Sequence, residues 1–369
     1  MYISRLNLKN FRNYESAEVD FSPHINFIMG NNGSGKTNIL EAISVLANIK
    51  SFRNISDHDI VKWKSSSYYT SAKVIEDVIK KFEVGFSFEN ERSRKKVKID
   101  DIEIKKASNY YGKFLVVIIS PNDINIINNG PEGRRHFFDS VISKTDQEYF
   151  EKLGEFKKTV INRNNLLKQL KERKINDIGQ LEPWDIIFAE KAAYITRKRG
   201  NFINSFKDTF FLNYKHIAPD DKVPDMKYIN TLDVFDEETI LKKLKERRTK
   251  DILIGNCGRG PHRDDFLLKN SDGIHFINYA SQGQKRTAVI SLKISECDII
   301  EKTLGKKAII LVDDIFSELD EKRRKSMIKL LSRENQVIFT MVNMNFIDND
   351  IINGSKRYEI NDNHIHSLP

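Results

Sequence analysis

The stretch GNNGSGKT, Gly30–Thr37, fits the pattern G-x-x-x-x-G-K-[ST] of a phosphate-binding loop. A short apolar run, Phe27–Met29, precedes it, and a helical pattern, NILEAISVLANI, follows it. The motif requires this strand–loop–helix context, because glycines let backbone N–H groups turn toward phosphate oxygens and the helix adds its positive end. A Gly-rich turn that binds nothing is the alternative, and the context argues against it.

The residue types within this loop predict how it binds ATP. Lys36 is expected to place its charge on the β- and γ-phosphates, and the Thr37 hydroxyl is expected to ligate Mg²⁺. The loop residues that we expect to bind ATP are Gly30, Asn31, Asn32, Gly33, Ser34, Gly35, Lys36, Thr37 and Asn38.

A second apolar run, Ala308–Val312, ends in two carboxylates, Asp313 and Asp314. In a protein with a phosphate loop, such a strand provides the metal and water side of the site, so we assign Asp313 to Mg²⁺ and Asp314 to the attacking water. Two acids that end a strand in solvent are the alternative. The next segment, FSELD (Phe316–Asp320), would make a good helix N-cap, but here it also predicts that Asp320 reaches a neighbouring nucleotide.

Composition narrows the classes of function that are possible but does not determine the function. The chain has 369 residues and a net charge of +9, which favours a polyanionic partner such as nucleic acid or an acidic membrane, with mere solubility as the alternative. Cys257 and Cys297 lack metal-ligand spacing, which suits reduced thiols in a cytoplasmic protein. We expect no signal peptide and no membrane span, because the apolar runs are too short.

Hydrophobic periodicity predicts an α/β fold with an insertion. Residues 1–120 are β-rich with one helix, and Lys95–Lys106 has the pattern of a hairpin. Residues 121–252 have long charged stretches with helical period. After residue 252 strands return, with a helix that ends near Leu304 and a strand at Gln336–Thr340. We therefore expect a discontinuous ATPase domain, 1–120 and 253–369, and a helical insertion, 121–252.

The stretch ASQGQKR, Ala280–Arg286, has a glycine turn typical of an anion-binding loop but no lysine placed to clamp a phosphate. It resembles the LSGGQ signature of ABC-type ATPases, with Ser281, Gly283 and Gln284 as matching residues. In that class the loop contacts the γ-phosphate of ATP held by a second subunit. The resemblance therefore implies an ATP-dependent homodimer, arranged head to tail. A plain helix N-terminus is the alternative for this loop alone.

These motifs together give the expected catalytic and ATP-binding residues. The expected catalytic residues are Lys36, Asp313, Asp314, Ser281 and Gln284, and Ser281, Gly283 and Asp320 are also expected to bind ATP across the dimer.

Further segments resemble the RecF family of bacterial recombination mediators nearly from end to end. They are LNLKNFRNY (Leu6–Tyr14), GNNGSGKTNILEAI (Gly30–Ile43), KSFR (Lys50–Arg53), SPNDINIINNGPEGRRHFFD (Ser120–Asp139), GPHRDD (Gly260–Asp265), ASQGQKRT and VDDIFSELD. The likeness implies an ABC-type ATPase head, a P-loop core with an antiparallel β subdomain, with ATP and Mg²⁺ as cofactors. It also implies a DNA-binding dimer of recombinational repair that helps to load RecA at gaps, with RecR and RecO as partners.

Two positions depart from the ABC-type pattern. Asp314 stands where these ATPases have Glu, and its shorter side chain predicts slow hydrolysis. The γ-phosphate-sensing His is replaced by Met341-Val342-Asn343, so its role is unassigned or falls to Thr340 or Asn343.

For several basic residues the sequence leaves two interpretations open. Arg12 and Arg53 match family positions near the nucleotide, and surface ion pairs are an equal alternative. The pair Arg134-Arg135 suggests a loop that faces nucleotide or DNA, or else a solvated helix start. The motif that contains His262 and Arg263 suggests catalysis or a structural corner with internal ion pairs.

Alternatives also remain for the kind of DNA that is bound and for the member of the superfamily to which the chain belongs. Basic residues of Ile195–Gly200 and Glu237–Lys250 are candidate contacts to the phosphates of single-stranded, gapped or duplex DNA, with a solvated face as the alternative. The rival functions are another SMC-like or overcoming-lysogeny-type ATPase, and a DNA scaffold that uses ATP only to hold a dimer.

Overall fold

The computed structural model describes residues 1–90, 92–332, 335–345, 347–361 and 363–368. The chain forms two compact units. The first unit comprises Met1–Ile124, Asn213–Asp220 and Arg286–Pro369, and the second comprises Asn125–Leu212 and Asp221–Lys285.

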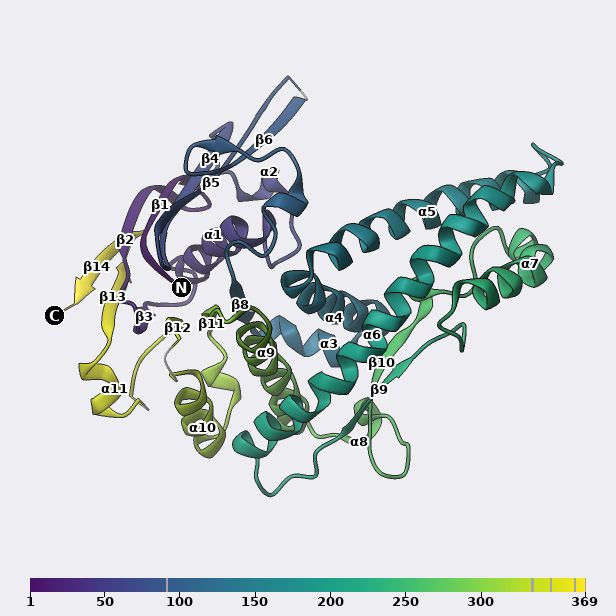
Figure 1. Cartoon of the computed structure of the whole chain (residues 1–369). Helices are drawn as coiled ribbons and strands as arrows, with labels where there is room; N and C mark the ends of the chain where they lie inside the picture. Colours follow the sequence, from purple (N-terminus) through teal and green to yellow (C-terminus); the bar gives the residue numbers. More distant parts are fainter. Residues whose placement is uncertain (91, 333–334, 346, 362, 369) are drawn as a thin grey trace. The chain divides into compact units, whose positions relative to one another are not determined.

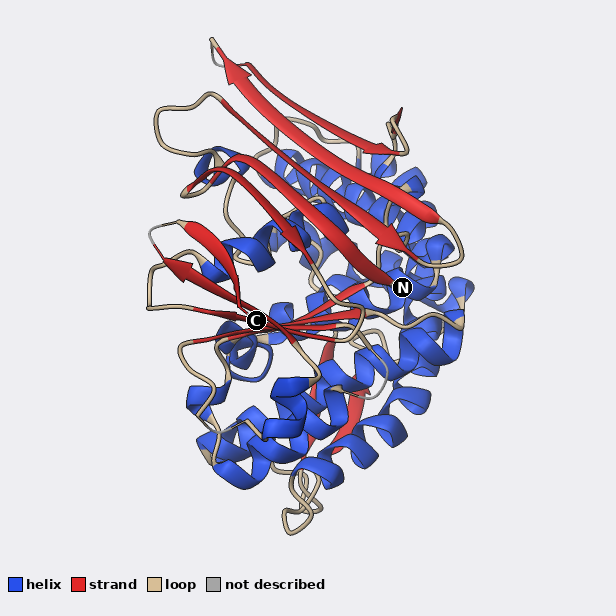
Figure 2. Ribbon diagram, turned by 90° about the vertical axis from the view of Figure 1, so that its left-hand side faces the viewer, coloured by secondary structure: helices blue, strands red, loops and turns tan. Residues whose placement is uncertain are grey.

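The first unit contains an antiparallel sheet of six strands, seen among the long red strands of Figure 2. Its strands alternate apolar and polar residues, so one face is buried and the other is solvated. In spatial order they are β2 (Tyr14–Asp20), β1 (Tyr2–Phe11), β4 (Ser67–Ile75), β5 (Ile79–Glu89), β6 (Arg92–Ile99) and β7 (Ile102–Glu103). The hairpin predicted within Lys95–Lys106 is confirmed as β6–β7.

A second six-stranded sheet of the same unit carries the phosphate loop and the paired acids. Its strands are parallel except for one antiparallel pair at an edge, β13 with β14. In order they are β14 (His364–Leu368), β13 (Lys356–Asn361), β3 (Ile25–Met29), β12 (Val337–Met341), β11 (Ile309–Asp313) and β8 (Val116–Ile119). The strands predicted from AIILVD and QVIFT are β11 and β12.

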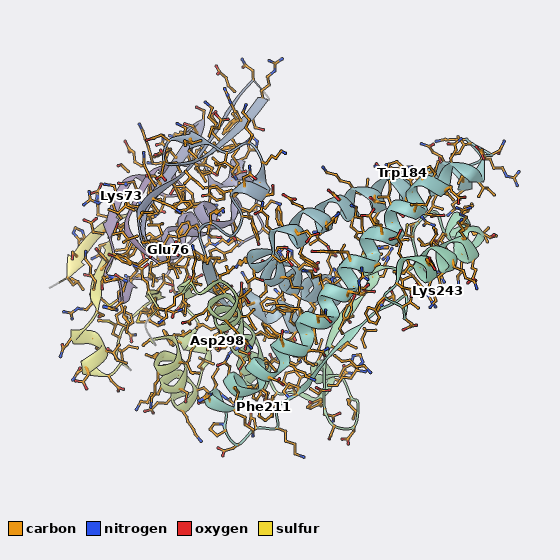
Figure 3. All side chains as sticks on the ribbon, in the orientation of Figure 1. Lys73, Glu76, Trp184, Phe211, Lys243 and Asp298 are labelled. Carbon is orange, nitrogen blue, oxygen red and sulfur yellow. The ribbon has the colours of Figure 1, made fainter. Side chains whose placement is uncertain are left out.

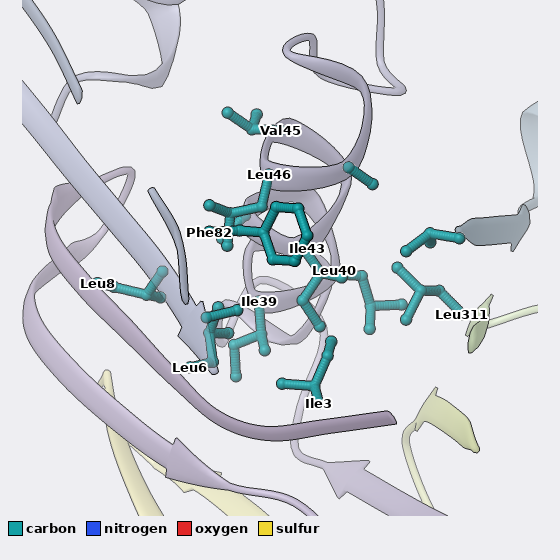
Figure 4. Packing of buried hydrophobic residues seen from close by; sticks show 14 of the residues in the cluster. Ile3, Leu6, Leu8, Ile39, Leu40, Ile43, Val45, Leu46, Phe82 and Leu311 are labelled. Atoms are coloured by element: carbon teal, nitrogen blue, oxygen red, sulfur yellow. The ribbon is translucent and has the colours of Figure 1, made fainter. Parts of the chain in front are cut away.

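Helix α1 (Lys36–Asn48) lies between the two sheets and is buried along nearly its whole length. Its apolar residues pack against Leu6, Leu8 and Phe82 of the antiparallel sheet and against Leu311 of the parallel sheet (Figure 4). Burial of each such side chain stabilises the fold by about 1.5–3 kcal/mol. The helix therefore holds the phosphate loop at its N-terminus on a rigid support.

The opposite face of the parallel sheet is covered by two helices, α9 (Gln282–Leu304) and α10 (Glu321–Leu331). Successive residues of β11 alternate between the faces: Ile309 and Leu311 belong to the α1 core, and Ile310 and Val312 belong to the α9 core. The helix predicted to end near Leu304 is confirmed. The remaining short helices of this unit are α2 (Asp57–Ile60), η1 (Ala107–Asn109), η2 (Pro121–Ile124), η5 (Phe316–Glu318) and α11 (Asn349–Asn353).

The second unit is mostly helical, with a core of its own that joins its long helices, which are labelled in Figure 1. Its helices are α3 (Asn125–Asn128), α4 (Pro131–Thr145), α5 (Gln147–Lys171), η3 (Ile178–Leu181), α6 (Glu182–Ile217), α7 (Glu237–Ile254), η4 (Pro261–Arg263) and α8 (Phe276–Tyr279). Helices α6 and α9 cross the boundary, because residues 213–217 and 286–304 belong to the first unit. All helices within the described ranges are too short or too polar to span a bilayer.

The boundaries of the second unit differ from those that the sequence predicts for the insertion. The insertion was expected to end at residue 252, whereas the unit continues to Lys285. The reason is an antiparallel strand pair, β9 (Asp225–Ile229) with β10 (Asp265–Lys269), which ties the later segment to the helices. The return of strand character after residue 252 therefore belongs in part to the second unit.

Candidate nucleotide-binding site

The phosphate loop follows β3 and needs glycine at two positions where the backbone is left-handed and crowded. Gly35 has φ 106, and a Cβ there would lie 2.5 Å from Asn13 Nδ2 and 2.7 Å from the Tyr14 hydroxyl. Gly30 has φ 150, and a Cβ there would lie 2.7 Å from the carbonyl oxygen of Ile360. A side chain at either position would therefore displace the wall of the loop.

Lys36 begins α1 and turns back over the loop. Its ammonium donates to the carbonyl oxygens of Gly30 (2.6 Å) and Asn31 (2.8 Å), and only 6% of the residue is exposed. Burial lowers the pKa of Lys36, against the opposing charges of Asp314 and Asp313. The loop thus already holds a cation where the sequence predicted the phosphate clamp.

The Thr37 hydroxyl and the paired acids meet at the end of β11. Thr37 Oγ1 and Thr340 Oγ1 each donate to the same oxygen, Asp313 Oδ1, at 2.8 Å. Asp313 is 8% exposed and Thr340 is fully buried. The structure therefore brings together two residues 276 positions apart that the sequence assigned to one metal site, and adds Thr340 as a third member.

Asp314 stands beside this group in an unusual backbone conformation, with φ 42. Its backbone N–H donates to the carbonyl and the hydroxyl of Thr340, both at 3.2 Å. Burial raises the pKa of the Asp314 carboxyl, Lys36 opposes that rise, and Asp313 adds to it. A carboxyl with a raised pKa is the type of group that accepts a proton from water.

Arg12 and Arg53 converge on one buried carboxylate, Glu41 of α1. Arg12 binds it in a bidentate manner at 2.8 and 2.9 Å, and Arg53 Nη1 lies 3.7 Å from Glu41 Oε2. The Ser51 hydroxyl donates to Glu41 Oε1 at 2.5 Å, and Arg53 Nη1 donates to Asn38 Oδ1 at 3.4 Å. Both arginines therefore form ion pairs, as one of the two interpretations predicted. These pairs lie beside the phosphate loop, and their shared partner, Glu41, has no exposed side-chain surface.

Sequence reasoning missed Glu41 and the side chains that wall the loop. Asn13 Oδ1 accepts from Asn38 Nδ2 at 2.7 Å, and the Tyr14 hydroxyl donates to the carbonyl of Gly35 at 3.2 Å. The available signals were a lone glutamate within an apolar helix pattern and the polar pair that ends LNLKNFRNY.

The signature residues belong to the second unit, whereas the phosphate loop belongs to the first. Ser281 and Gln284 form a reciprocal cap: Ser281 N–H donates to Gln284 Oε1 at 3.0 Å, and Gln284 N–H donates to Ser281 Oγ at 3.2 Å. Gly283 lies in the first turn of α9, and Asp320 caps α10 by accepting from Arg323 N–H at 2.9 Å. In a single chain these residues thus act as helix caps. This is the alternative to a phosphate contact that the sequence left open.

The motif GPHRDD forms a structural corner of the second unit. Asp265 binds Arg134 through two hydrogen bonds of 2.7 and 2.9 Å, and Arg135 Nη1 donates to the carbonyl of Asp264 at 2.7 Å. The alternative of a solvated helix start for Arg134 and Arg135 is therefore wrong, because both side chains are partly buried in contacts to GPHRDD.

His262 packs against the rings of Phe156 and Phe188, and burial lowers its pKa to about 4. Its Nε2 lies 3.0 Å from the carbonyl oxygen of Cys257. These contacts support the interpretation of GPHRDD as a corner with internal ion pairs.

Arg199 lies within a segment predicted to contact DNA, and for this residue the prediction is wrong. It is 2% exposed, binds Asp139 through hydrogen bonds of 2.9 Å, and lies 3.6 Å from Asp264. A guanidinium held in this way cannot reach a DNA phosphate.

The loop and the end of β11 fit ATP and Mg²⁺. Ser34 Oγ is buried and, within the described residues, has no hydrogen-bond partner, so the loop retains an unused donor. Thr37 and Asp313 offer the hard oxygen ligands that Mg²⁺ prefers.

Comparisons with known proteins show the family to which this chain belongs. The family described as "RecF/RecN/SMC N terminal domain" matches residues 2–363. The chain is 35% identical over 346 residues to a DNA replication and repair protein RecF of Leptospira interrogans, covering 93% of this chain and 92% of that protein. It is 37% identical to the RecF of Caldanaerobacter subterraneus, covering 90% and 92%.

Solved structures give the same result. A structure described as the recombination mediator RecF with ATP in the RecFOR pathway has a TM-score of 0.89 at 33% identity, covering 100% of this chain and 98% of that one. An SMC head domain of Pyrococcus furiosus has a TM-score of 0.54 at 17% identity, covering 100% and 96%, which shows a shared fold only. The fold is therefore that of an ABC-type ATPase head, as the sequence predicted, and the chain belongs to the RecF family of DNA replication and repair proteins.

Proposed function

We propose that the chain is a DNA-binding ATPase of recombinational repair and replication that closes as a dimer around ATP and reopens after slow hydrolysis. The observation that carries this proposal is the contact between Thr37 and Asp313 at 2.8 Å, which joins the phosphate loop to the paired acids. A nucleotide site needs both parts at one place.

Each residue of the site has a specific role in this proposal. Lys36 binds the β- and γ-phosphates, and Thr37 and Asp313 hold Mg²⁺, which neutralises charge on the phosphates when it is bound. Asp314 orients the attacking water and accepts its proton, and its short side chain makes hydrolysis slow. Arg12 and Arg53 add positive charge beside the loop.

The signature residues complete the site of a second copy. Ser281 and Gln284 cap the start of α9, and Gly283 lies between them without a side chain, so an anion can approach the positive end of the helix closely. Asp320 lies at the equivalent end of α10. Two copies related by a two-fold axis would then enclose two ATP molecules.

The family membership supports the biological setting of this proposal. The chain would act in the cytoplasm on single-stranded or gapped duplex DNA, with RecR and RecO, and help to load RecA at gaps. Two of the solved relatives are described as components of the RecFOR pathway.

Light scattering after size exclusion tests the dimer, with no nucleotide, with ADP and with a slowly hydrolysed ATP analogue. We expect a dimer only with the analogue, and a monomer for Ser281→Arg even with it. Identical profiles in all three conditions would refute the dimer. The matched control is Ser205→Arg, which changes an exposed serine of α6 in the same way.

Hydrolysis distinguishes this proposal from a scaffold that uses ATP only to hold a dimer. We expect the wild type to release phosphate faster than Asp314→Asn, and DNA to increase its rate. Equal rates for the two proteins would favour the scaffold.

A further inference from the structure

The outward face of strand β6 presents four cations in alternate positions: Arg92, Arg94, Lys96 and Lys98. The register of β6 with β5 fixes this face, because the intervening Val97 lies opposite Val84 in the core. Side chains on one face of a strand recur about every 6.7 Å. The strand therefore carries a straight row of positive charge along the solvated face of the antiparallel sheet.

Neighbouring strands extend this row with two further cations. Lys9 of β1 and Lys73 of β4, which is labelled in Figure 3, are exposed on the same face. In the described part of the chain, none of these six cations forms an ion pair. The row is thus not consumed by salt bridges, although the exposed Glu103 of β7 stands opposite Lys98.

The acids of this face are mostly engaged elsewhere. Glu83 lies 3.0 Å from Lys81 and accepts from the Tyr69 hydroxyl, and Asp20 lies 2.6 Å from Arg5. Glu89, opposite Arg92 near the hairpin end, is exposed. Glu103 of β7, opposite Lys98 at the other end, is exposed as well, so two acids remain beside the row, one near each end.

The surface between the cations is open. Gly85 stands opposite Lys96, and Ser87 stands opposite Arg94. The backbone at Gly85 does not require glycine, and a Cβ there would make only ordinary contacts, with Tyr69 Cδ2 at 3.9 Å and the carbonyl oxygen of Tyr68 at 4.0 Å. Glycine inside a strand weakens it and often marks a place where a ligand approaches closely.

The cations predicted to contact DNA in the second unit are, by contrast, largely used within that unit. Lys198 binds Asp146 at 2.6 Å, and Arg248 binds Asp185 at 2.7 Å. Lys245 binds Glu182 at 2.6 Å. Such pairs reduce the charge that remains for a phosphate backbone.

We propose that the outward face of β6, with Lys9 and Lys73, is the contact surface for the phosphate backbone of DNA. This assignment rests on the proposed function, which requires DNA binding, and moves its principal site from the helical insertion to the antiparallel sheet.

The test compares two variants that lose the same charge. The β6 variant is Arg92→Thr, Arg94→Thr, Lys96→Thr and Lys98→Thr, in which threonine keeps strand propensity. The control replaces four exposed cations of α6 and α7 by glutamine, and its changes are Arg197→Gln, Lys207→Gln, Lys242→Gln and Lys250→Gln. Each variant lowers the net charge from +9 by four, to +5.

Binding of a fluorescent gapped duplex is measured by anisotropy with the ATP analogue over a series of salt concentrations. Each lost phosphate contact lowers the slope of log K against log salt by about 0.9, so four lower it by about 3.6. Raising salt from about 50 to about 200 mM should then weaken wild-type binding roughly 100-fold more than binding by the β6 variant. The control should keep the wild-type slope.

The possible outcomes distinguish a failure of this surface assignment from a failure of the proposed function. Equal slopes for the β6 variant and the wild type, or equal losses in both variants, would overturn the surface and leave DNA binding intact. A wild type that does not bind DNA with the analogue would overturn both. Loss of binding to phosphatidylglycerol vesicles with unchanged DNA binding would assign the face to lipid and overturn our assignment.

Folding of the β6 variant is checked by its affinity for the ATP analogue, which should equal that of the wild type. The single variant Lys96→Thr, which lies opposite Gly85, should lower the salt slope by about 0.9 and provides the same test if the quadruple variant does not fold.

Discussion

Replacement of Glu41 by glutamine tests whether the buried carboxylate holds the arginines beside the phosphate loop. Glu41 has no exposed surface, and it accepts two hydrogen bonds from Arg12 and one from Ser51. The change Glu41→Gln keeps the shape of the side chain and removes its charge. Arg12 then loses the opposite charge and one of its two hydrogen bonds to this side chain, because an amide NH2 group cannot accept, and keeps the other together with the carbonyl of Asp59, at 2.7 Å.

The expected loss of stability follows from burial. Breaking a fully buried ion pair costs about 3–5 kcal/mol, because it leaves one charge without compensation. The Arg12 side chain is 20% exposed, so water relieves part of that penalty. We therefore expect Glu41→Gln to lower the free energy of unfolding by about 1.5–3 kcal/mol, the range for a hydrogen bond to a charged group.

Urea unfolding of the wild type and two variants measures this loss. The matched control is Glu18→Gln, which makes the same chemical change at an ion pair with Arg5 whose side chains are 54% and 40% exposed. An exposed pair contributes about 0–1 kcal/mol, so the control should remain close to the wild type. Affinity for ATP should also fall about tenfold in Glu41→Gln alone, which corresponds to about 1.4 kcal/mol. A Glu41→Gln variant as stable as the control, with unchanged ATP affinity, would show that Glu41 does not organise this site.

Three further predictions concern the metal side of the site, the end of α1 and the corner of the second unit. Thr340→Val removes one donor to Asp313 and should weaken ATP binding about tenfold with Mg²⁺ but not with EDTA, as measured by calorimetry; equal weakening in both conditions would contradict a role at the metal. Lys95→Met removes the contacts of β6 to Ile49 and Asp57, both 2.6 Å, and should reduce the stimulation of phosphate release by DNA while the basal rate stays the same. The third concerns His262, whose pKa is lowered from 6.5 to about 4 by burial, so the unfolded chain binds the extra proton between these values. Wild-type stability should therefore be fully present above pH 6.5 and fall by at most about 1.4 kcal/mol per pH unit down to about pH 4. Urea unfolding of His262→Gln should lack this component, and parallel pH profiles for the two proteins would exclude it.

The phosphate loop and the paired acids could be predicted from the sequence because each is a local pattern. A strand, a glycine loop and a helix lie within Phe27–Asn48, and an apolar strand ends directly in Asp313. Their meeting at Thr37 follows from the rule that the carboxyl ends of parallel strands lie at one edge of a sheet.

The contacts of the second unit could not be predicted in this way. Arg134 and Asp265 are 131 residues apart, and no periodicity specifies that they pair. The same limit applies to the pairing of β9 with β10, which moves the boundary of the unit to Lys285. A basic run such as Arg197-Lys198-Arg199 likewise does not show which cation faces solvent, although helical period leaves Arg197 exposed and buries Arg199.

Helix α1 offers a physical route by which the proposed binding of ATP and of DNA would influence each other. Its N-terminus carries Lys36 and Thr37, its middle carries Glu41, and the carbonyl that follows its C-terminus, that of Ile49, accepts from Lys95 of β6. Lys95 is on the inward face of the strand whose outward face we assign to DNA. Because α1 is packed between two sheets, we infer that a displacement of β6 would be transmitted through the helix to the phosphate loop. If DNA raises the affinity for ATP through this helix, ATP must raise the affinity for DNA by the same factor.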